Sequence, residues 1–80
     1  MAIHRILAPL PGIFYRRPSS DEAPFKSEGD TISVGDTLGL IEVMKSFFPV
    51  EAETAGRLVR FLIEEGATID AGNILAEIEN

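Results

Sequence analysis

Short apolar runs, separated by polar or glycine-containing turns, recur along the whole chain. The clearest runs lie at residues 6–8, 13–15, 38–43, 47–50, 58–63 and 74–78. Each is three to seven residues long, and none continues with the 3.6-residue period that an amphipathic helix requires. The turns between them carry Glu-Gly, Gly-Asp or Gly-Asn pairs, which are typical of strand reversals. The pattern therefore predicts an all-β domain.

The two halves of the chain repeat this pattern at an offset of 37 residues. Eight of the sixteen positions from 28 to 43 are identical to those from 65 to 80, among them Thr31 with Thr68 and Leu38 with Leu75. A self-match of this kind indicates two similar structural units. Two strand-rich halves related by a pseudo-twofold predict a small β-sandwich or flattened barrel.

An insertion distinguishes the first half from the second. Gly12 matches Gly56 at an offset of 44 rather than 37, so seven extra residues lie between Gly12 and Glu28. That interval contains the polar, proline-bounded stretch Arg-Arg-Pro-Ser-Ser-Asp-Glu-Ala-Pro at residues 16–24. Proline and small polar residues favour irregular backbone, so we expect a projecting loop at about residues 17–24.

Two apolar segments indicate where the core and the strand edges lie. The segment at residues 58–63 is too apolar for simple alternation, which predicts either a bulge near Arg60 or burial on both faces of the strand, with Phe61 and Ile63 in the core. We interpret residues 47–49, Phe-Phe-Pro, as core and strand-edge residues rather than as a cofactor surface.

Lys45 stands between two strand-like runs, where a hairpin turn is expected. A turn between paired strands is exposed to solvent, so the long side chain of Lys45 projects outward, either as an attachment point or as an ordinary surface charge. Met44 precedes it, and the turn contains no glycine, asparagine or aspartate, although two-residue hairpins prefer those residues. The pseudo-twofold places Lys45 at the opposite end of the domain from the carboxyl terminus, an arrangement that suits a carrier.

Composition narrows the possible functions. The 80 residues predict one domain, residues 1–80, and seven Lys and Arg against thirteen Asp and Glu give a formal net charge of −6. That charge argues against nucleic acid or an anionic membrane as partner. The absence of cysteine and the single histidine, His4, disfavour a metal site. No apolar run approaches the roughly 20 residues of a membrane span, so we expect a soluble, cytoplasmic protein.

The chain resembles the biotinyl domain of biotin carboxyl carrier proteins, in particular the acetyl-CoA carboxylase subunit. The resemblance covers nearly the whole chain and rests on four motifs: Ala-Pro-Leu-Pro-Gly-Ile-Phe-Tyr-Arg at residues 8–16, Val-Gly-Asp-Thr-Leu at 34–38, Glu-Val-Met-Lys at 42–45 and Ile-Leu-Ala-Glu-Ile-Glu at 74–79. It implies two four-stranded antiparallel sheets in a flattened β-barrel, with the insertion forming a thumb that lies over the biotin ring. Related lipoyl domains share the fold but lack the thumb and the methionine before lysine.

The resemblance also implies a function. A biotin protein ligase would acylate Lys45, and the biotinyl group would then shuttle as carboxybiotin from biotin carboxylase to carboxyltransferase, for acetyl-CoA carboxylation in fatty acid synthesis. A lysine amine is protonated at neutral pH, so the ligase must remove a proton before the amine attacks. The domain itself would be a non-catalytic carrier whose tethered arm raises the local concentration of the reactive group.

Several residues around Lys45 keep more than one interpretation. Met44 either packs in the turn or is read by the ligase, and Glu42 either helps the ligase to dock or is a solvated strand residue. Val43 and Ser46 stand where the family has alanine and a second methionine, and these flanking positions affect modification.

In the thumb, the family commonly has a small residue between an arginine and a proline, where this chain has Arg17 before Pro18. It commonly has a second proline where this chain has Ser20. Three alternatives remain open for the whole domain: a carrier for another biotin-dependent carboxylase, a lipoyl carrier, or an unmodified adaptor module.

Overall fold

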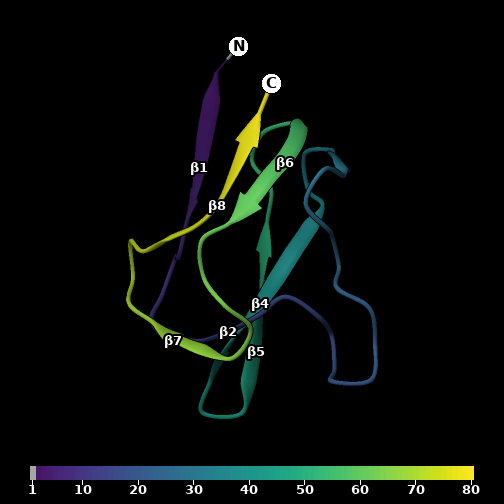
Figure 1. Ribbon diagram of the computed structural model, residues 1–80. Helices are drawn as coiled ribbons and strands as arrows, with labels where there is room; N and C mark the ends of the chain where they lie inside the picture. Colours follow the sequence, from purple (N-terminus) through teal and green to yellow (C-terminus); the bar gives the residue numbers. More distant parts are fainter. Residues whose placement is uncertain (1) are drawn as a thin grey trace.

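The computed structural model describes residues 2–80, and those residues form eight strands joined by turns and loops (Figure 1). The strands are β1 (Ile3–Leu7), β2 (Gly12–Tyr15), β3 (Thr31–Ile32), β4 (Thr37–Val43), β5 (Ser46–Glu51), β6 (Gly56–Phe61), β7 (Ala67–Ile69) and β8 (Ile74–Glu79). They build two four-stranded antiparallel sheets, which confirms the predicted fold class. No described residue belongs to a helix that could cross a membrane.

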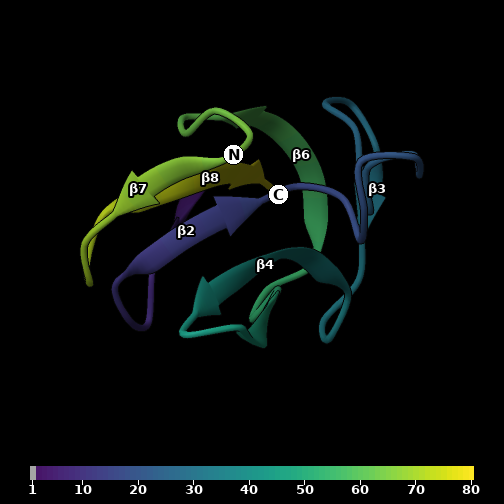
Figure 2. The same cartoon turned by 90° about the horizontal axis from the view of Figure 1, so that it is seen from below.

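The order of strands shows the pseudo-twofold directly. The first sheet runs β1-β8-β6-β3 and the second runs β5-β4-β2-β7. Each strand of the first sheet has a counterpart four strands away in the chain: β1 corresponds to β5, β8 to β4, β6 to β2 and β3 to β7. The counterparts stand in the same order in the second sheet. The sequence repeat is therefore a repeat of four strands, and each sheet takes strands from both halves (Figure 2).

The core consists of matching residues from the two halves. Its members are buried between the two sheets, and they include the pairs Ile32 and Ile69, Leu38 and Leu75, Ile41 and Ile78, Ala8 and Ala52, and Phe14 and Leu58. The first three pairs are separated by 37 residues and the last two by 44, the two offsets of the repeat. Burial of these side chains supplies the main driving force for folding.

Glycine at two equivalent positions lets neighbouring strands approach closely. A Cβ atom on Gly12 would lie 2.5 Å from the carbonyl oxygen of Glu42 and 2.7 Å from Ile41 Cγ2. The equivalent Gly56 meets the carbonyl oxygen of Glu79 in the same way. Gly12 begins β2 and Gly56 begins β6, so the same close approach of two strands occurs in both halves of the repeat.

The segment around Arg60 contains the predicted irregularity. The pairing of β6 with β8 shifts register between Leu58 and Arg60. Phe61 and Ile63 are partly buried and pack against the core rather than inside it, so their predicted burial is only partial. The rings of Phe14 and Phe61 pack at an angle of 45° to each other, with their centroids 6.2 Å apart.

The interpretation of residues 47–49 as core is wrong, although their place at a strand edge is confirmed. Phe47 and Phe48 are 55% and 43% exposed, and Pro49 is also exposed. They lie on β5, the outermost strand of its sheet. Because nothing covers the far side of that strand among the described residues, apolar side chains there stay in contact with solvent.

The loop between β2 and β3 is closed at its base. The Phe25 N–H donates to the Arg16 carbonyl oxygen at 2.9 Å, and the Arg16 guanidinium lies 4.8 Å from the centroid of the Phe61 ring, a cation–π contact. Lys26 forms an ion pair with Asp36 at 3.3 Å. These contacts fix the base of the thumb, residues 17–24, on the body of the domain.

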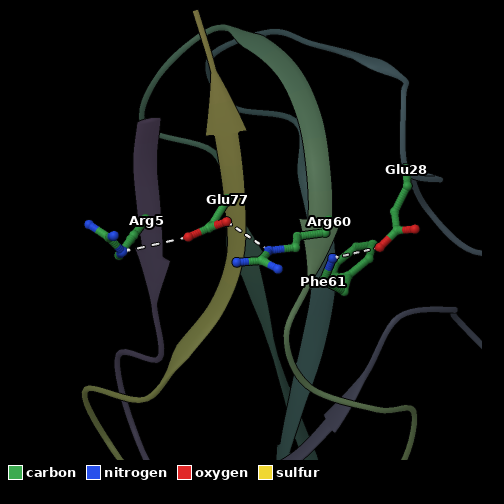
Figure 3. A network of polar contacts seen from close by, with 5 residues as sticks. All are labelled: Arg5, Glu28, Arg60, Phe61 and Glu77. Atoms are coloured by element: carbon green, nitrogen blue, oxygen red, sulfur yellow. Dashed lines mark hydrogen bonds and ion pairs between the residues drawn. The ribbon is translucent and has the colours of Figure 1, made fainter. Parts of the chain in front are cut away.

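A charged network crosses the outer face of the first sheet (Figure 3). Glu77 on β8 contacts Arg60 of β6, with 2.8 Å between Arg60 Nε and Oε1, and Arg5 of β1, with 3.6 Å between Arg5 Nε and Oε2. Nearby, the Phe61 N–H donates to Glu28 at 3.0 Å. One largely buried carboxylate therefore links three adjacent strands.

Candidate functional site

The β4–β5 hairpin ends in a two-residue turn made of Met44 and Lys45. Val43 pairs with Ser46, and the backbone φ angles of Met44 and Lys45 are 51° and 66°. Positive φ at both central residues is the geometry of a type I′ turn, which matches the right-handed twist of the paired strands. Figure 1 places this hairpin at the opposite end of the molecule from both termini.

The turn geometry exposes the lysine. Lys45 is exposed, Met44 is 94% exposed, and none of the ion pairs among the described residues includes the Lys45 amine. The amine is thus free to meet another molecule. Since Met44 buries almost none of its surface, its interpretation as a turn-packing residue is wrong.

Exposed apolar residues lie close to Lys45 in the sequence. Met44, Phe47 and Phe48 are three of the large hydrophobic residues that the fold leaves exposed, and all lie within three positions of Lys45. Phe47 and Phe48 are consecutive on β5, so their side chains point to opposite faces of the sheet. The hairpin therefore presents an exposed amine next to an exposed methionine, with one exposed phenylalanine on each face of the strand that follows.

A cleft beside the hairpin separates the thumb from the outer face of the second sheet. Its volume is about 360 Å³, and its walls are formed by Tyr15, Leu40, Glu42 and Phe47 of the sheet, Arg17, Pro18, Ser19 and Ser20 of the thumb, and Glu65. Glu42 pairs with Phe47, one step from the Val43–Ser46 pair that closes the turn. The fold thus brings Arg17 and Pro18 of the thumb to the strands that carry Lys45.

A hydrogen bond between neighbouring strands lines this cleft. The Tyr15 hydroxyl donates to Glu42 Oε1 at 3.0 Å, and this bond to the carboxylate raises the pKa of Tyr15. The phenol therefore stays neutral and keeps Glu42 oriented. Glu42 is a strand residue that is only partly solvated, because its side chain is partly buried and has a partner on β2.

Arg17 brings a donor without a partner into the same cleft. Its Nε is buried and makes no hydrogen bond, since Glu65 Oε2 lies 4.0 Å away. The other oxygen of Glu65 accepts the Arg16 N–H. A buried donor without an acceptor is costly, and the ion pair with Glu65 is the only compensation for Arg17 Nε among the described residues.

Sequence reasoning missed most of this cleft. The sequence pattern predicts no role there for Tyr15, Leu40 or Glu65. Alternation in the sequence places Leu40 and Glu42 on one face of their strand, but it does not show that Tyr15 lies opposite Leu40. Nor does it show the approach of Glu65 from the loop before β7. Among the described residues no group of three or more metal-ligating side chains occurs.

Comparison with known proteins agrees with this geometry. A family model described as biotin-requiring enzyme, of the biotin and lipoyl attachment type, matches residues 4–78. The chain is 36% identical over 76 residues to the biotin carboxyl carrier protein of acetyl-CoA carboxylase from Haemophilus influenzae, covering 95% of this chain and 49% of that protein. It is 34% identical over 74 residues to the protein of the same name from Pyropia yezoensis, covering 92% and 47%.

Solved structures show the same fold within larger proteins. The urea carboxylase of Kluyveromyces lactis aligns with 99% of this chain and 6% of its own, at 25% identity and a TM-score of 0.82. A single-chain, multi-domain long-chain acyl-CoA carboxylase aligns with 94% of this chain and 7% of its own, at 25% identity and a TM-score of 0.77.

The chain spans about half the length of the curated relatives that it matches. The family model, by contrast, covers nearly all of the chain, including the hairpin that carries Lys45. The protein therefore belongs to the biotin and lipoyl attachment family of biotin-requiring enzymes.

Proposed function

We propose that Lys45 is the biotinylation site of a carrier domain formed by residues 1–80, of which Met1 lies outside the described residues. The observation that carries this proposal is the type I′ turn, which exposes an unpaired amine at the tip of a hairpin. The biotin carboxyl carrier proteins to which the chain is similar support biotin as the attached group.

The cleft under the thumb fits such a group. Its floor of Leu40 and Phe47 is apolar, while Arg17 and the thumb serines supply hydrogen-bond donors. An apolar pocket with a few polar groups is the usual form of a small-molecule site. Lys45 would hold biotin covalently and the thumb, including Arg17 and Pro18, would hold its ring. Biotin supplies the chemistry of accepting and releasing a carboxyl group.

Attachment needs a ligase, because the carboxyl group of biotin must be activated before an amine can attack it. With a biotinyl adenylate as donor, the Lys45 nitrogen would form an amide bond to the biotinyl carbonyl carbon while AMP leaves with the electron pair of the broken C–O bond. The amine loses its protons to the ligase site or to solvent. Amide formation removes one positive charge, which takes the formal net charge from −6 to −7.

We further propose acetyl-CoA as the final acceptor, with biotin carboxylase loading the arm, carboxyltransferase unloading it, and the cytoplasm as the compartment. The names of the curated relatives support this assignment. The carboxylases that share the fold act on urea and on long-chain acyl-CoA, so the same domain type serves other acceptors. The carboxyltransferase then determines which acceptor is carboxylated, and the domain only presents the biotinyl group to it.

Intact-mass measurement after coexpression with a biotin protein ligase tests the attachment. We expect one biotinyl increment on the natural chain and none on Lys45→Arg. Lys26→Arg is the matched control, because it makes the same substitution at a lysine outside the hairpin, and it should be modified fully. An unmodified natural chain would overturn the proposal, and a lipoyl increment with a lipoate ligase would replace it with a lipoyl carrier.

A further inference from the structure

The sequence repeat places a Glu-Gly pair at residues 28–29 and again at 65–66. In each pair the glycine N–H donates to the carbonyl oxygen of a buried strand residue: to Leu58 of β6 at 2.7 Å from the first pair, and to Phe14 of β2 at 2.8 Å from the second. Leu58 and Phe14 are themselves equivalent in the repeat, at the offset of 44. The two turns therefore bind matching strands at matching positions.

The glutamate of each pair binds the same strand a little further along. Glu28 accepts the Phe61 N–H at 3.0 Å (Figure 3), and Glu65 accepts the Arg16 N–H. The two strand positions differ by one residue in the repeat, and the register shift within β6 accounts for that residue. Because the fold forms this contact in both halves, the place of the Glu65 carboxylate is set by the repeat.

In the first half, this contact lies where the chain leaves the sheet. β2 ends at Tyr15, and Arg16 is the next residue. Its N–H donates to Glu65, and its carbonyl oxygen accepts the Phe25 N–H at 2.9 Å. A hydrogen bond from a backbone N–H to a carboxylate is charge-assisted and therefore stronger than a neutral one. Both backbone groups at the start of the thumb are thus fixed, one of them by Glu65.

The second oxygen of the same carboxylate lies near the first residue of the thumb. Glu65 Oε2 is 4.0 Å from Arg17 Nε, and the two side chains are 32% and 35% exposed. Within residues 2–80, no other ion pair or hydrogen bond joins the thumb, residues 17–24, to the rest of the domain. The polar contacts of Glu65 therefore determine how the thumb leaves β2.

The backbone of the thumb carries this direction onward. Arg17 stands before Pro18, and a residue before proline is restricted to extended conformations, while the proline ring fixes its own φ. The direction set at Arg16 is therefore kept through the first part of the thumb. Residues 17–20 form one wall of the cleft, and Glu65 lines it as well. A change at Glu65 would thus move that whole wall.

We propose that Glu65 is a positioning residue: it sets the direction of the thumb and so holds the cleft in the shape that receives the ring of the group on Lys45. This inference rests on the proposed biotin attachment. Glu65 acts through Arg16 and Arg17, at the base of the thumb. Exposed ion pairs contribute little to the stability of a whole fold, so the effect of Glu65 falls on the thumb and not on the core.

The order of the thumb in the unmodified chain tests the proposal first. Nitrogen-15 relaxation gives the order parameters of the backbone amides at residues 19–21. In Glu65→Ala we expect them to fall from about 0.85, the value of a rigid backbone, to below about 0.6, the value of a flexible one. Glu64→Ala is the matched control, because this neighbouring glutamate is exposed and its side chain forms no ion pair among the described residues. It should leave the order parameters unchanged.

Glu65→Gln separates the hydrogen bond from the charge. Glutamine keeps an oxygen that accepts the Arg16 N–H, but it loses the ion pair with Arg17. We expect order parameters between those of the natural chain and Glu65→Ala. Adding Arg17→Ala to Glu65→Gln should lower them no further, because both changes remove the same ion pair. Urea unfolding midpoints of all these variants should match that of the natural chain, which a general loss of structure would not allow.

The biotinylated chain supplies the readout that is specific to the ring. Nuclear Overhauser effects from the biotin ring to the side chains of Tyr15 and Leu40 should weaken about two- to fivefold in Glu65→Ala, the change in population that loss of one surface ion pair can cause. They should persist in Glu64→Ala, and intact mass should show one biotinyl increment on both variants.

Three outcomes would overturn the role of Glu65: unchanged thumb order in Glu65→Ala, an equal loss of order in Glu64→Ala, or ring contacts that do not depend on Glu65. A natural chain that accepts no biotin is a different result. It would overturn the proposed attachment at Lys45, while the order parameters of the unmodified chain would still decide whether Glu65 positions the thumb.

Discussion

Met44 and Lys45 hold backbone angles that their side chains disfavour. For a residue with a Cβ atom, the left-handed region costs about 1 kcal/mol or more, and asparagine or glycine would avoid most of that cost. The strand pairs behind the turn impose the geometry, because Val43 pairs with Ser46 and Ile41 with Phe48. The strain therefore stays local, at the two residues that a ligase would meet first.

Replacing Met44 with glycine tests this strain. We expect Met44→Gly to raise the free energy of unfolding by about 0.5 to 1 kcal/mol, because glycine accepts a positive φ without steric cost. Met44→Ala removes the same side chain but keeps the Cβ atom, so it should change stability by less than about 0.5 kcal/mol. Urea unfolding of both variants measures the difference, and equal stability of the two would contradict the argument.

Asp36 makes the stability of the domain depend on pH. The Ser33 N–H donates to Asp36 Oδ2 at 2.8 Å and Lys26 lies 3.3 Å from the same oxygen. The hydrogen bond from Ser33 first, and then Lys26, lowers the pKa of Asp36 below its ordinary value of 3.8, although desolvation opposes them. The unfolded chain therefore binds a proton at a higher pH than the folded chain does.

The sign of the effect follows from this difference. Asp36 stabilises the fold above pH 3.8, and the contribution disappears as the pH falls through the lower, folded-state pKa. We expect Asp36→Asn to be less stable than the natural chain at neutral pH and to approach it in acid. Unfolding midpoints measured across that range would show converging curves, and parallel curves would argue against a role for this carboxylate.

At the scale of elements, β2 positions both walls of the candidate site. It pairs with β4 on one side and β7 on the other, and it leads from Gly12 to Tyr15 and the base of the thumb. Gly12 lets β2 lie close to β4, where an added Cβ would meet the Glu42 carbonyl oxygen and Ile41. The close approach of β2 to β4 therefore fixes the positions of both the hairpin and the thumb.

Gly12→Ala should disturb that crossing. We expect a loss of about 2 to 3 kcal/mol in the free energy of unfolding, because the methyl group collides with backbone atoms that cannot turn aside. Gly35→Ala is the control, since it has a φ of 91° but no atom within 4 Å of the added Cβ, and it should cost about 1 kcal/mol. Chemical unfolding compares them, and a Gly12→Ala cost no greater than that of the control would refute the steric account.

At the scale of the whole molecule, two copies of a four-strand unit share one core. Neither unit can bury its apolar face alone, because each sheet takes strands from both halves. Ile41 and Ile78 are equivalent in the repeat, and both are 0% exposed. Because the two isoleucines occupy equivalent core positions, they should contribute equally to the free energy of unfolding. This holds even though only the first of the two strands, β4, leads to Lys45.

Truncation of the two isoleucines measures that equivalence. We expect Ile41→Ala and Ile78→Ala each to lower the free energy of unfolding by about 2 to 5 kcal/mol, through lost burial and the cavity left behind. Val34→Ala, at a position 67% exposed, should change it by less than about 0.5 kcal/mol. Calorimetry or denaturant titration gives the values, and a marked inequality between the two isoleucines would show that the halves are energetically different.

The sequence by itself determined the strands, the internal repeat and the position of Lys45 in a turn. These features depend on local physics: alternation selects which face of a strand is buried, and turn chemistry selects where the chain reverses. The matching offsets of Thr31 with Thr68 and Gly12 with Gly56 carried enough information to predict two related halves and one insertion. The positive φ angles of Met44 and Lys45 result from the two-residue length of the hairpin, because neither residue favours that backbone region.

Only the tertiary structure decided which apolar residues are covered and which distant residues meet. Phe47 and Phe48 have strong apolar character, yet they remain exposed because β5 is an outer strand. The cleft joins Tyr15 to Glu42 across 27 residues and brings Arg17 near Glu65. Burial and contact of this kind depend on the order of strands across each sheet, a long-range property that local alternation does not encode.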